Sequence, residues 1–145
     1  MVALLSVADR LLGQGDAERA EQWLRQADEV AEKFGSSVLR ERAFLDIACS
    51  VAVLLCHRPD EAERRLLQAR EVGETSGRLP VVASTLLLEA GVLALRGDVD
   101  AARDARRRAK ELLPGWSHER CVRAVERLIL DPVLGSAATS SPSKD

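Results

Sequence analysis

Aromatic residues are scarce in this sequence: they make up 3% of its 145 residues, and tyrosine is absent. Proteins that bind single-stranded nucleic acid stack bases on aromatic side chains, and β-sandwiches place aromatic and β-branched residues in their strands. The composition therefore argues against both classes. With 46% hydrophobic and 30% charged residues, it is typical of a single globular domain whose helices pack through alanine and leucine.

The chain also has few cysteines, namely Cys49, Cys56 and Cys121. The first two lie seven residues apart in a predicted helix, which separates their Cα atoms by roughly 10 Å. A disulfide needs less than about 7 Å. We therefore expect free thiols that act as small hydrophobic residues in a cytoplasmic protein.

The sequence motifs of common enzymes are missing as well. The two histidines do not form a His-x-x-x-His pair, and neither a Cys-x-x-Cys motif nor a glycine-rich phosphate loop occurs. Cys56 and His57 are neighbours, but adjacent residues of a helix point about 100° apart. A core thiol beside a surface histidine is therefore expected, and the sequence predicts no enzyme, no catalytic residue, no metal site and no cofactor.

Uncharged apolar runs are short. The longest apolar stretch, 79–95, contains Glu89 and falls below the roughly 18 to 20 uncharged residues that cross a bilayer. Asp9 and Arg10 interrupt the apolar N-terminal segment, and no cleavage site follows, so we expect no signal peptide. The net charge of −2 gives the chain no overall electrostatic attraction to nucleic acid or to membranes.

An internal repeat is the main signal in the sequence. Residues 15–27, 57–69 and 97–109 align without gaps, and their pattern recurs every 40 to 42 residues. Two alanine columns run through the alignment: Ala20, Ala62 and Ala102, then Ala27, Ala69 and Ala109. Because residues seven apart share a helical face, alanine at both positions allows a neighbouring helix to approach closely. Each unit is therefore predicted to be an apolar helix, a tight turn and a second helix.

Turn residues separate the two helices of each unit. Gly15 and Gly97 favour the left-handed conformation that ends a helix, and Asp16 and Asp98 are suited to cap the next one. In the middle unit Pro59 is expected to begin the second helix, because proline fits the first turn of a helix. The first helices of the second and third units are apolar nearly all round, which predicts burial on several sides.

These signals together give a map of the chain. The predicted helices are 2–14, 16–34, 37–57, 59–75, 80–96, 98–113 and 117–130. The linkers at 35–36 and 76–77 are short, so successive helices are expected to be antiparallel neighbours. The last helix suits a cap over the last hairpin, and 131–145 is small, polar and proline-bearing, which predicts a disordered tail.

The repeat resembles the tetratricopeptide repeat (TPR): a Gly-Asp turn, alanine four residues after the Asp, and a second alanine seven residues later. The first and third units match, Pro114 stands where the family often places a terminating proline, and the middle unit departs with His57-Arg58. The resemblance covers about residues 1–114. Its long spacing is similar to the longer-helix variant in the signal-reading regions of large bacterial transcription activators, and its richness in Ala, Arg and Leu is similar to actinobacterial members.

The resemblance implies an all-α fold, an α-solenoid of three antiparallel hairpins (about 2–35, 37–75 and 80–113) with a capping helix at 117–130, together forming domain 1–130. It also implies a groove that receives a partner. Family members that clamp a C-terminal carboxylate carry Lys, Arg and Asn on the inner helices. The corresponding positions here are apolar, so a carboxylate clamp is not expected, and an apolar partner-binding groove is the candidate: Phe44, Ile47, Val51, Leu54 and Leu87. The alternative is that these residues are covered by the next helix or by other protein.

Charged residues give two weaker candidates. A basic stripe for phosphate or an acidic partner is formed by Arg103, Arg106, Arg107 and Lys110. The favoured alternative is a solvated outer face beside Asp104 and Glu111. Because Arg106 falls in the column of Leu24 and Leu66, the outer face of the last hairpin is expected to be open there.

Asp46 and Glu89 are single acids in otherwise apolar helices. A buried lone carboxylate is expensive and can mark a functional site. The favoured alternatives are a salt bridge, such as Asp46 with Arg42 one turn earlier, or exposure at the edge of the groove.

Two functions follow from these features. The first is a protein-protein interaction module that binds a peptide, a helix or a partner domain. The second is a C-terminal sensor or regulatory fragment of a larger bacterial transcriptional regulator. The first helix begins with apolar side chains and no capping residue, which predicts an upstream covering element or self-association through this helix. Direct contact with nucleic acid and membrane binding are not expected.

Overall fold

The computed structural model describes residues 2–34 and 39–135. Within this part the chain is all-helical and contains no β-strand. The helices are, in order, α1 (Val2–Gly13), α2 (Ala17–Phe34), α3 (Leu39–Leu55), α4 (Pro59–Thr75), α5 (Leu79–Leu95), α6 (Val99–Leu112), α7 (Arg120–Val125), the π-helix η2 (Glu126–Leu130) and α8 (Asp131–Leu134). The predicted all-α class is confirmed, and the predicted linker at 35–36 lies outside the described residues.

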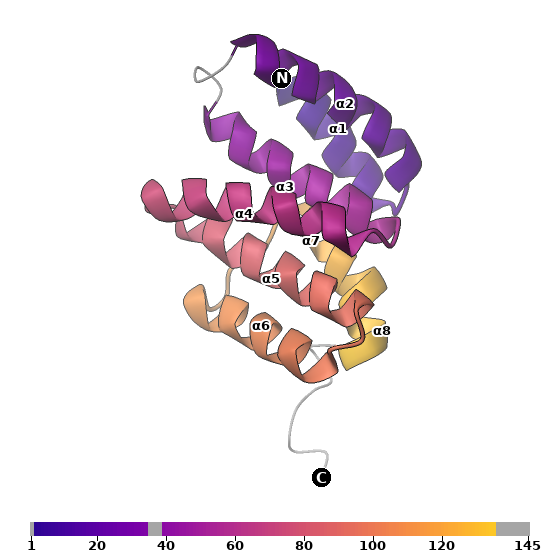
Figure 1. Cartoon of the computed structure of the whole chain (residues 1–145), viewed down its shortest axis with the longest axis vertical. Helices are drawn as coiled ribbons and strands as arrows, with labels where there is room; N and C mark the ends of the chain where they lie inside the picture. Colours follow the sequence, from indigo (N-terminus) through magenta and orange to yellow (C-terminus); the bar gives the residue numbers. More distant parts are fainter. Residues whose placement is uncertain (1, 35–38, 136–145) are drawn as a thin grey trace.

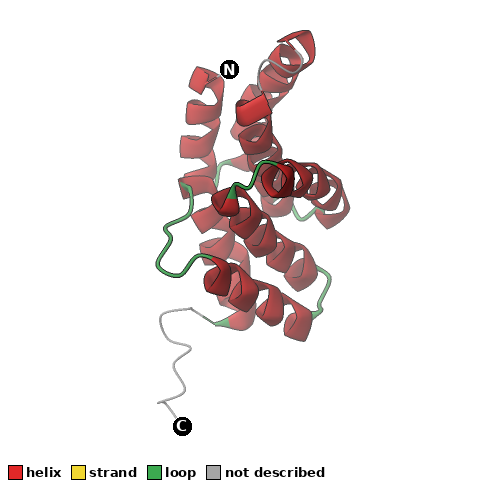
Figure 2. Cartoon of the chain, turned by 90° about the vertical axis from the view of Figure 1, so that its left-hand side faces the viewer, coloured by secondary structure: helices red, strands yellow, loops and turns green. Residues whose placement is uncertain are grey.

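Consecutive helices pack side by side along the molecule. α1 contacts α2, α3 contacts α4, and α5 contacts α6, while α2 touches α3 and α4 touches α5. Figures 1 and 2 show the chain advancing from one end of the long axis to the other as it passes from α1 to α6. The first helices also form a row, because α3 contacts both α1 and α5.

The two alanine columns lie at these helix contacts. All six of their side chains are at most 1% exposed. Small side chains let the helix axes approach closely, and the larger apolar residues of α3 and α5 fill the remaining core. The prediction that the alanines mark helix contacts is confirmed.

The turns between the paired helices have the same backbone form. Gly15 and Gly97 have φ of 83°, and His57, at the equivalent place, has φ of 60°. In each turn this residue donates its N–H to the carbonyl three residues back, and the next residue donates to the carbonyl five back. This pair of hydrogen bonds is the Schellman motif, which ends many helices. Asp16 and Asp98 accept from the N–H three residues later at 3.3 Å, which confirms the predicted caps.

The C-terminal segment departs from the prediction. It does not simply cap the last hairpin: α7 runs back across the row of first helices and contacts α1, α3 and α5. Val122, Val125 and Leu130 are completely buried. The Asp9 carboxylate in α1 accepts the Cys121 N–H at 3.0 Å. The inner side of the molecule is thus filled by the chain itself.

The expectation of a bare apolar N-terminal face is wrong for the core-facing side of α1. α7 covers α1, whose large residues Leu5, Leu11 and Leu12 are buried. The exposed positions of α1 are Val2, Ala3, Ser6 and Arg10, and Val2 is 64% exposed. Self-association through the first helix stays a prediction.

The predicted start of the disordered tail, at residue 131, is also too early in the sequence. Residues 131–134 form α8, while 136–145 lie outside the described residues. α8 contacts α6, where Arg106 is 6% exposed and donates to the Gly135 carbonyl at 2.9 Å. The position that was expected to be open is therefore closed by α8. Among the described residues, none of the helices combines the length and apolar character that a bilayer crossing needs.

The returning C-terminal segment is expected to stabilise the fold. Leu130 is completely buried, whereas Leu128, two residues earlier, is 46% exposed. Leu130→Ala should lower the free energy of unfolding by about 3 kcal/mol, because it removes packed methyl groups and leaves a cavity. The matched change Leu128→Ala should cost less than about 1 kcal/mol. Urea unfolding followed by circular dichroism measures both, and equal losses would contradict the burial of this segment.

Candidate functional site

The predicted apolar groove is not a surface. Ile47, Val51, Leu54 and Leu87 are between 0% and 5% exposed, and Phe44 is partly buried. The Val125 and Leu54 side chains meet at Gly91, where α7 lies over α3 and α5. The groove prediction is wrong, and the alternative in which these residues are covered by another helix holds.

The predicted basic stripe is neutralised by carboxylates. Arg103 pairs with Asp100 at 3.5 Å, Arg107 pairs with Glu111 at 3.0 Å and also with Asp104, and Lys110 lies 3.7 Å from Glu126. Arg106 is buried and lies 3.5 Å from Asp131. These four residues therefore form no continuous basic stripe, because paired charges largely cancel each other's field.

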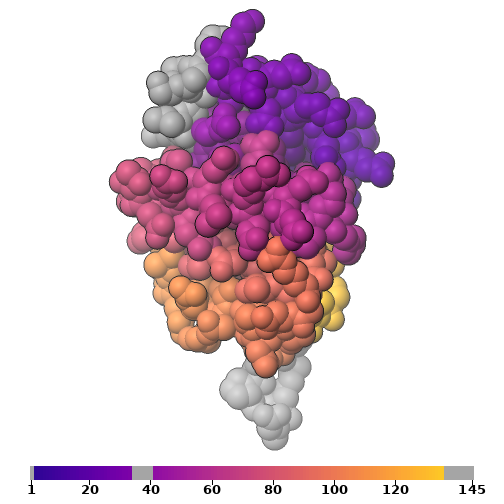
Figure 3. All heavy atoms as spheres, in the orientation of Figure 1, coloured from indigo at the N-terminus to yellow at the C-terminus, as the bar shows by residue number. Residues whose placement is uncertain are grey.

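An outer groove lies between α2 and α4, with α3 as its floor. Its volume is about 440 Å³. Figure 3 shows α2 in violet above α4 in magenta on this face of the molecule. Charged side chains line the walls, and Leu24, Cys49, Ala52 and Val53 contribute apolar surface at the base. The repeat pattern of the sequence does not predict this groove.

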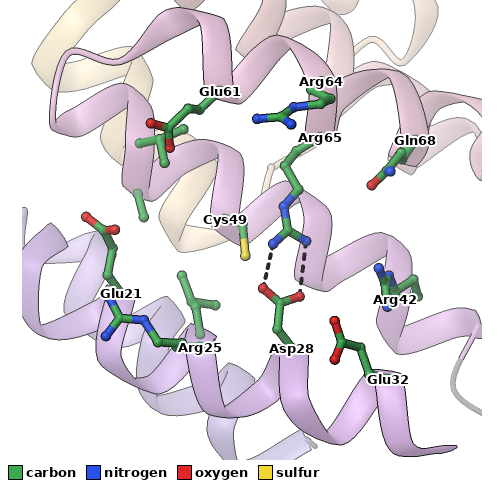
Figure 4. A pocket seen from close by; sticks show the side chains of 13 residues that line it. Glu21, Arg25, Asp28, Glu32, Arg42, Cys49, Glu61, Arg64, Arg65 and Gln68 are labelled. Atoms are coloured by element: carbon green, nitrogen blue, oxygen red, sulfur yellow. Dashed lines mark hydrogen bonds and ion pairs between the residues drawn. The ribbon is translucent and has the colours of Figure 1, made fainter. Parts of the chain in front are cut away.

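Arg65 joins the three helices of the groove. From α4 its Nη1 and Nη2 atoms donate to both carboxylate oxygens of Asp28 in α2, at 3.1 and 2.5 Å, as Figure 4 shows. Nη1 also donates to Asp46 Oδ1 in α3 at 2.9 Å. A bidentate pair of this kind fixes both distance and orientation. Arg65 therefore sets the spacing between α2 and α4.

Asp46 is the buried member of this cluster. It is 1% exposed, and burial raises its pKa while the nearby Arg65 opposes that rise. Arg42, the partner expected from the sequence, lies 3.9 Å away. The salt-bridge explanation of Asp46 is confirmed, with Arg65 as the closer partner.

Cys49 lies at the base of the groove but is not poised for chemistry. Its side chain is buried, and this burial raises the pKa of the thiol to about 12. A thiol that stays protonated at neutral pH is a poor nucleophile and a poor metal ligand. Within the described residues, no group of three or more His, Cys, Asp or Glu side chains is arranged to hold a metal ion.

The rim of the groove carries charges of two kinds. Glu21 and Glu61 are both bound by Arg58, at 2.7 and 3.1 Å. Arg25 on α2 and Arg64 on α4 are exposed, and neither has an ion-pair partner within the described part of the chain. The acids of the rim are thus partly neutralised, while these two arginines remain available to a ligand.

A smaller groove occupies the equivalent place in the next unit. It lies between α4 and α5, has a volume of about 150 Å³, and is lined by residues that include Glu63, Leu66, Arg70, Glu89 and Val92. These occupy the repeat positions of five residues that line the larger groove: Glu21, Leu24, Asp28, Cys49 and Ala52. The smaller groove is narrower because Arg70, Glu89 and Val92 replace the smaller side chains of Asp28, Cys49 and Ala52. Arg70 and Glu89 form an ion pair there, which confirms the salt-bridge explanation of Glu89.

Comparison with known proteins adds no relative: no protein-family model, curated protein or solved structure matches this chain. The assignment of the outer groove therefore depends on its geometry. One signal in the sequence points to it. Arg65 falls in the repeat column of Trp23 and Ala105, so a charge stands where the other units have apolar residues.

The Arg65 cluster predicts a pH-dependent loss of stability. Arg65→Met leaves Asp46 buried without its closest cation and should lower the free energy of unfolding by about 3 kcal/mol near pH 7. Without Arg65 the folded-state pKa of Asp46 lies further above its unfolded value. The folded protein then binds a proton that the unfolded chain releases, so the deficit shrinks as the pH falls toward about 4.

Chemical denaturation at several pH values measures this effect. Adding Asp46→Asn to Arg65→Met should recover part of the loss, because it removes the unpaired charge. Arg64→Met, one residue earlier and exposed, is the matched control and should change stability by less than about 0.5 kcal/mol. A deficit that is the same at every pH would show that Asp46 is not its cause.

Proposed function

We propose that this chain is a protein-protein interaction module, an α-solenoid of three TPR-like hairpins. Three recurring features support a stacked repeat: the buried alanine columns, the Schellman turns at Gly15, His57 and Gly97, and the contacts of each helix pair with the next. Repeats that cannot bury their apolar faces alone gain a continuous core by stacking.

An ion pair between neighbouring units recurs as well. Glu21 in α2 accepts from Arg58, which precedes α4, at 2.7 Å. Glu63, at the equivalent position in α4, accepts from Arg96, which precedes α6, at 3.0 Å. Each pair joins the second helix of one unit to the turn of the following unit. These pairs support a fixed geometry of the outer surface.

The outer groove is the proposed binding surface, because the inner side is occupied by α7. Its open volume of about 440 Å³ between α2 and α4 is the observation that carries the proposal. Leu24 and Val53 offer an apolar floor, and Arg25 and Arg64 stand on opposite walls. A peptide segment with apolar side chains flanked by acidic ones is complementary to this arrangement.

Selection from a random peptide library displayed on phage tests the proposal. Peptides enriched on the immobilised chain should combine acidic and apolar residues. Their affinity should fall about tenfold or more in both Arg25→Glu and Arg64→Glu, because each change places like charges face to face. Calorimetric titration with synthetic peptides measures these ratios.

The matched control is Arg108→Glu. Arg108 is exposed on α6, away from the groove, and carries the same formal charge as Arg25 and Arg64. It should bind the selected peptides as the unchanged chain does. Absence of enrichment above an unrelated helical protein, or equal binding to the Arg64→Glu variant, would contradict the proposal.

A further inference from the structure

A second cavity lies at the other end of the described structure. It has a volume of about 380 Å³ and is bounded by α5, α6, η2 and the loop that leads to α7. Leu87 from α5, Lys110 from α6, Trp116 and His118 from the loop, and Glu126 from η2 line it. None of these residues takes part in the outer groove, and the volume lies in the range of small-molecule sites.

Glu126 has an unusual environment in this cavity. Its Oε2 atom is buried and has no hydrogen-bond partner within the described residues. The nearest cation, Lys110 Nζ, lies 3.7 Å away, beyond hydrogen-bond distance. A buried acceptor without a donor costs free energy and calls for a missing partner. Glu126 is also the first residue of a π-helix, an element frequently found at functional sites.

The loop supplies polar and apolar contacts to the same space. His118 Nδ1 lies 3.2 Å from Ser84 Oγ, which fixes the ring and leaves Nε2 for another partner. Burial, together with the charge of Lys110, lowers the pKa of His118, so the ring is neutral at pH 7. The Trp116 side chain is 46% exposed, and Leu87 lies at the base.

The neighbouring opposite charges restrict the ligand. A simple cation would meet repulsion from Lys110, and a simple anion would meet repulsion from Glu126. Lys110 and Glu126 lie 3.7 Å apart as a loose ion pair, so a ligand of single charge would compete with one of them for the other. A zwitterion satisfies both groups, since its ammonium can donate to Glu126 while its carboxylate accepts from Lys110.

We propose that this cavity is a binding site for a free α-amino acid with an apolar side chain. The ammonium group donates to Glu126 and the carboxylate accepts from Lys110. The side chain lies against Trp116 and Leu113 in the loop that leads to α7. The site is independent of the outer groove and of the peptide proposed to bind there.

Fluorescence of a single tryptophan tests the proposal. The chain has two tryptophans, so Trp23→Phe leaves Trp116 as the only reporter. Titration with leucine and the other apolar amino acids should give a saturable change for at least one of them. Isopentylamine and 4-methylpentanoate, which each lack one charged group of leucine, are the matched analogues. Each should bind about tenfold or more weakly than leucine, since a site built around a hydrogen-bonding group rejects ligands without it.

A second measurement uses the chain with both tryptophans. Amide chemical shifts report amino-acid binding to this chain and to single-substitution variants of it. Glu126→Gln and Lys110→Met should each weaken amino-acid binding about tenfold or more. Glu111→Gln, an exposed acid on α6, is the control and should leave binding unchanged. Circular dichroism checks that all variants are folded.

Three results would overturn the proposal. These are no saturable response to any apolar amino acid up to about 10 mM in either measurement, an amine or acid analogue that binds as tightly as the amino acid, or full affinity in folded Glu126→Gln. Loss of peptide binding in the outer groove would leave this site unaffected, so the two proposals fail separately.

Discussion

Close approach of helices through alanine is the constraint on which the rest of this structure depends. With no tyrosine and few other aromatic residues, the chain cannot fill wide gaps between helices. It relies on fully buried alanines such as Ala20, Ala62 and Ala102, which bring the helices near enough for the leucines and valines to interlock. The outer groove opens where such contact is lacking, between α2 and α4, and there a charged bridge spans the gap.

That bridge shows how a buried acid is tolerated. Asp46 lies inside a helix that is otherwise apolar, and Arg65 offsets its desolvation while also holding Asp28. Replacing such a network by apolar residues is often neutral or stabilising in other proteins. Its value here lies in geometry: it joins α4 to both α2 and α3 across the cleft.

The helices and their turns were predictable from local patterns, because alanine periodicity and Gly-Asp turns act within a few residues of themselves. The partners of Arg65 were not, since Asp28 and Asp46 lie 37 and 19 residues away. The path of α7 was not predictable for a similar reason. The apolar residues Val122, Val125, Leu128 and Ile129 predict a buried face, but they do not show which surface covers it, and Leu128 is in fact 46% exposed. The predicted groove failed on this point, and the cavity around Glu126 depends on the same long-range packing.

The return of α7 to α1 also affects how the polypeptide matures during synthesis. The bond from Cys121 to Asp9 joins residues 112 apart, and the bond from Arg127 to Gly13 joins residues 114 apart. At 5 to 20 residues per second, a ribosome needs on the order of 10 s to travel that distance. For that interval the inner sides of the first helices lack their cover and are open to chaperones or to neighbouring nascent chains. The fold therefore becomes complete only when its last helices arrive.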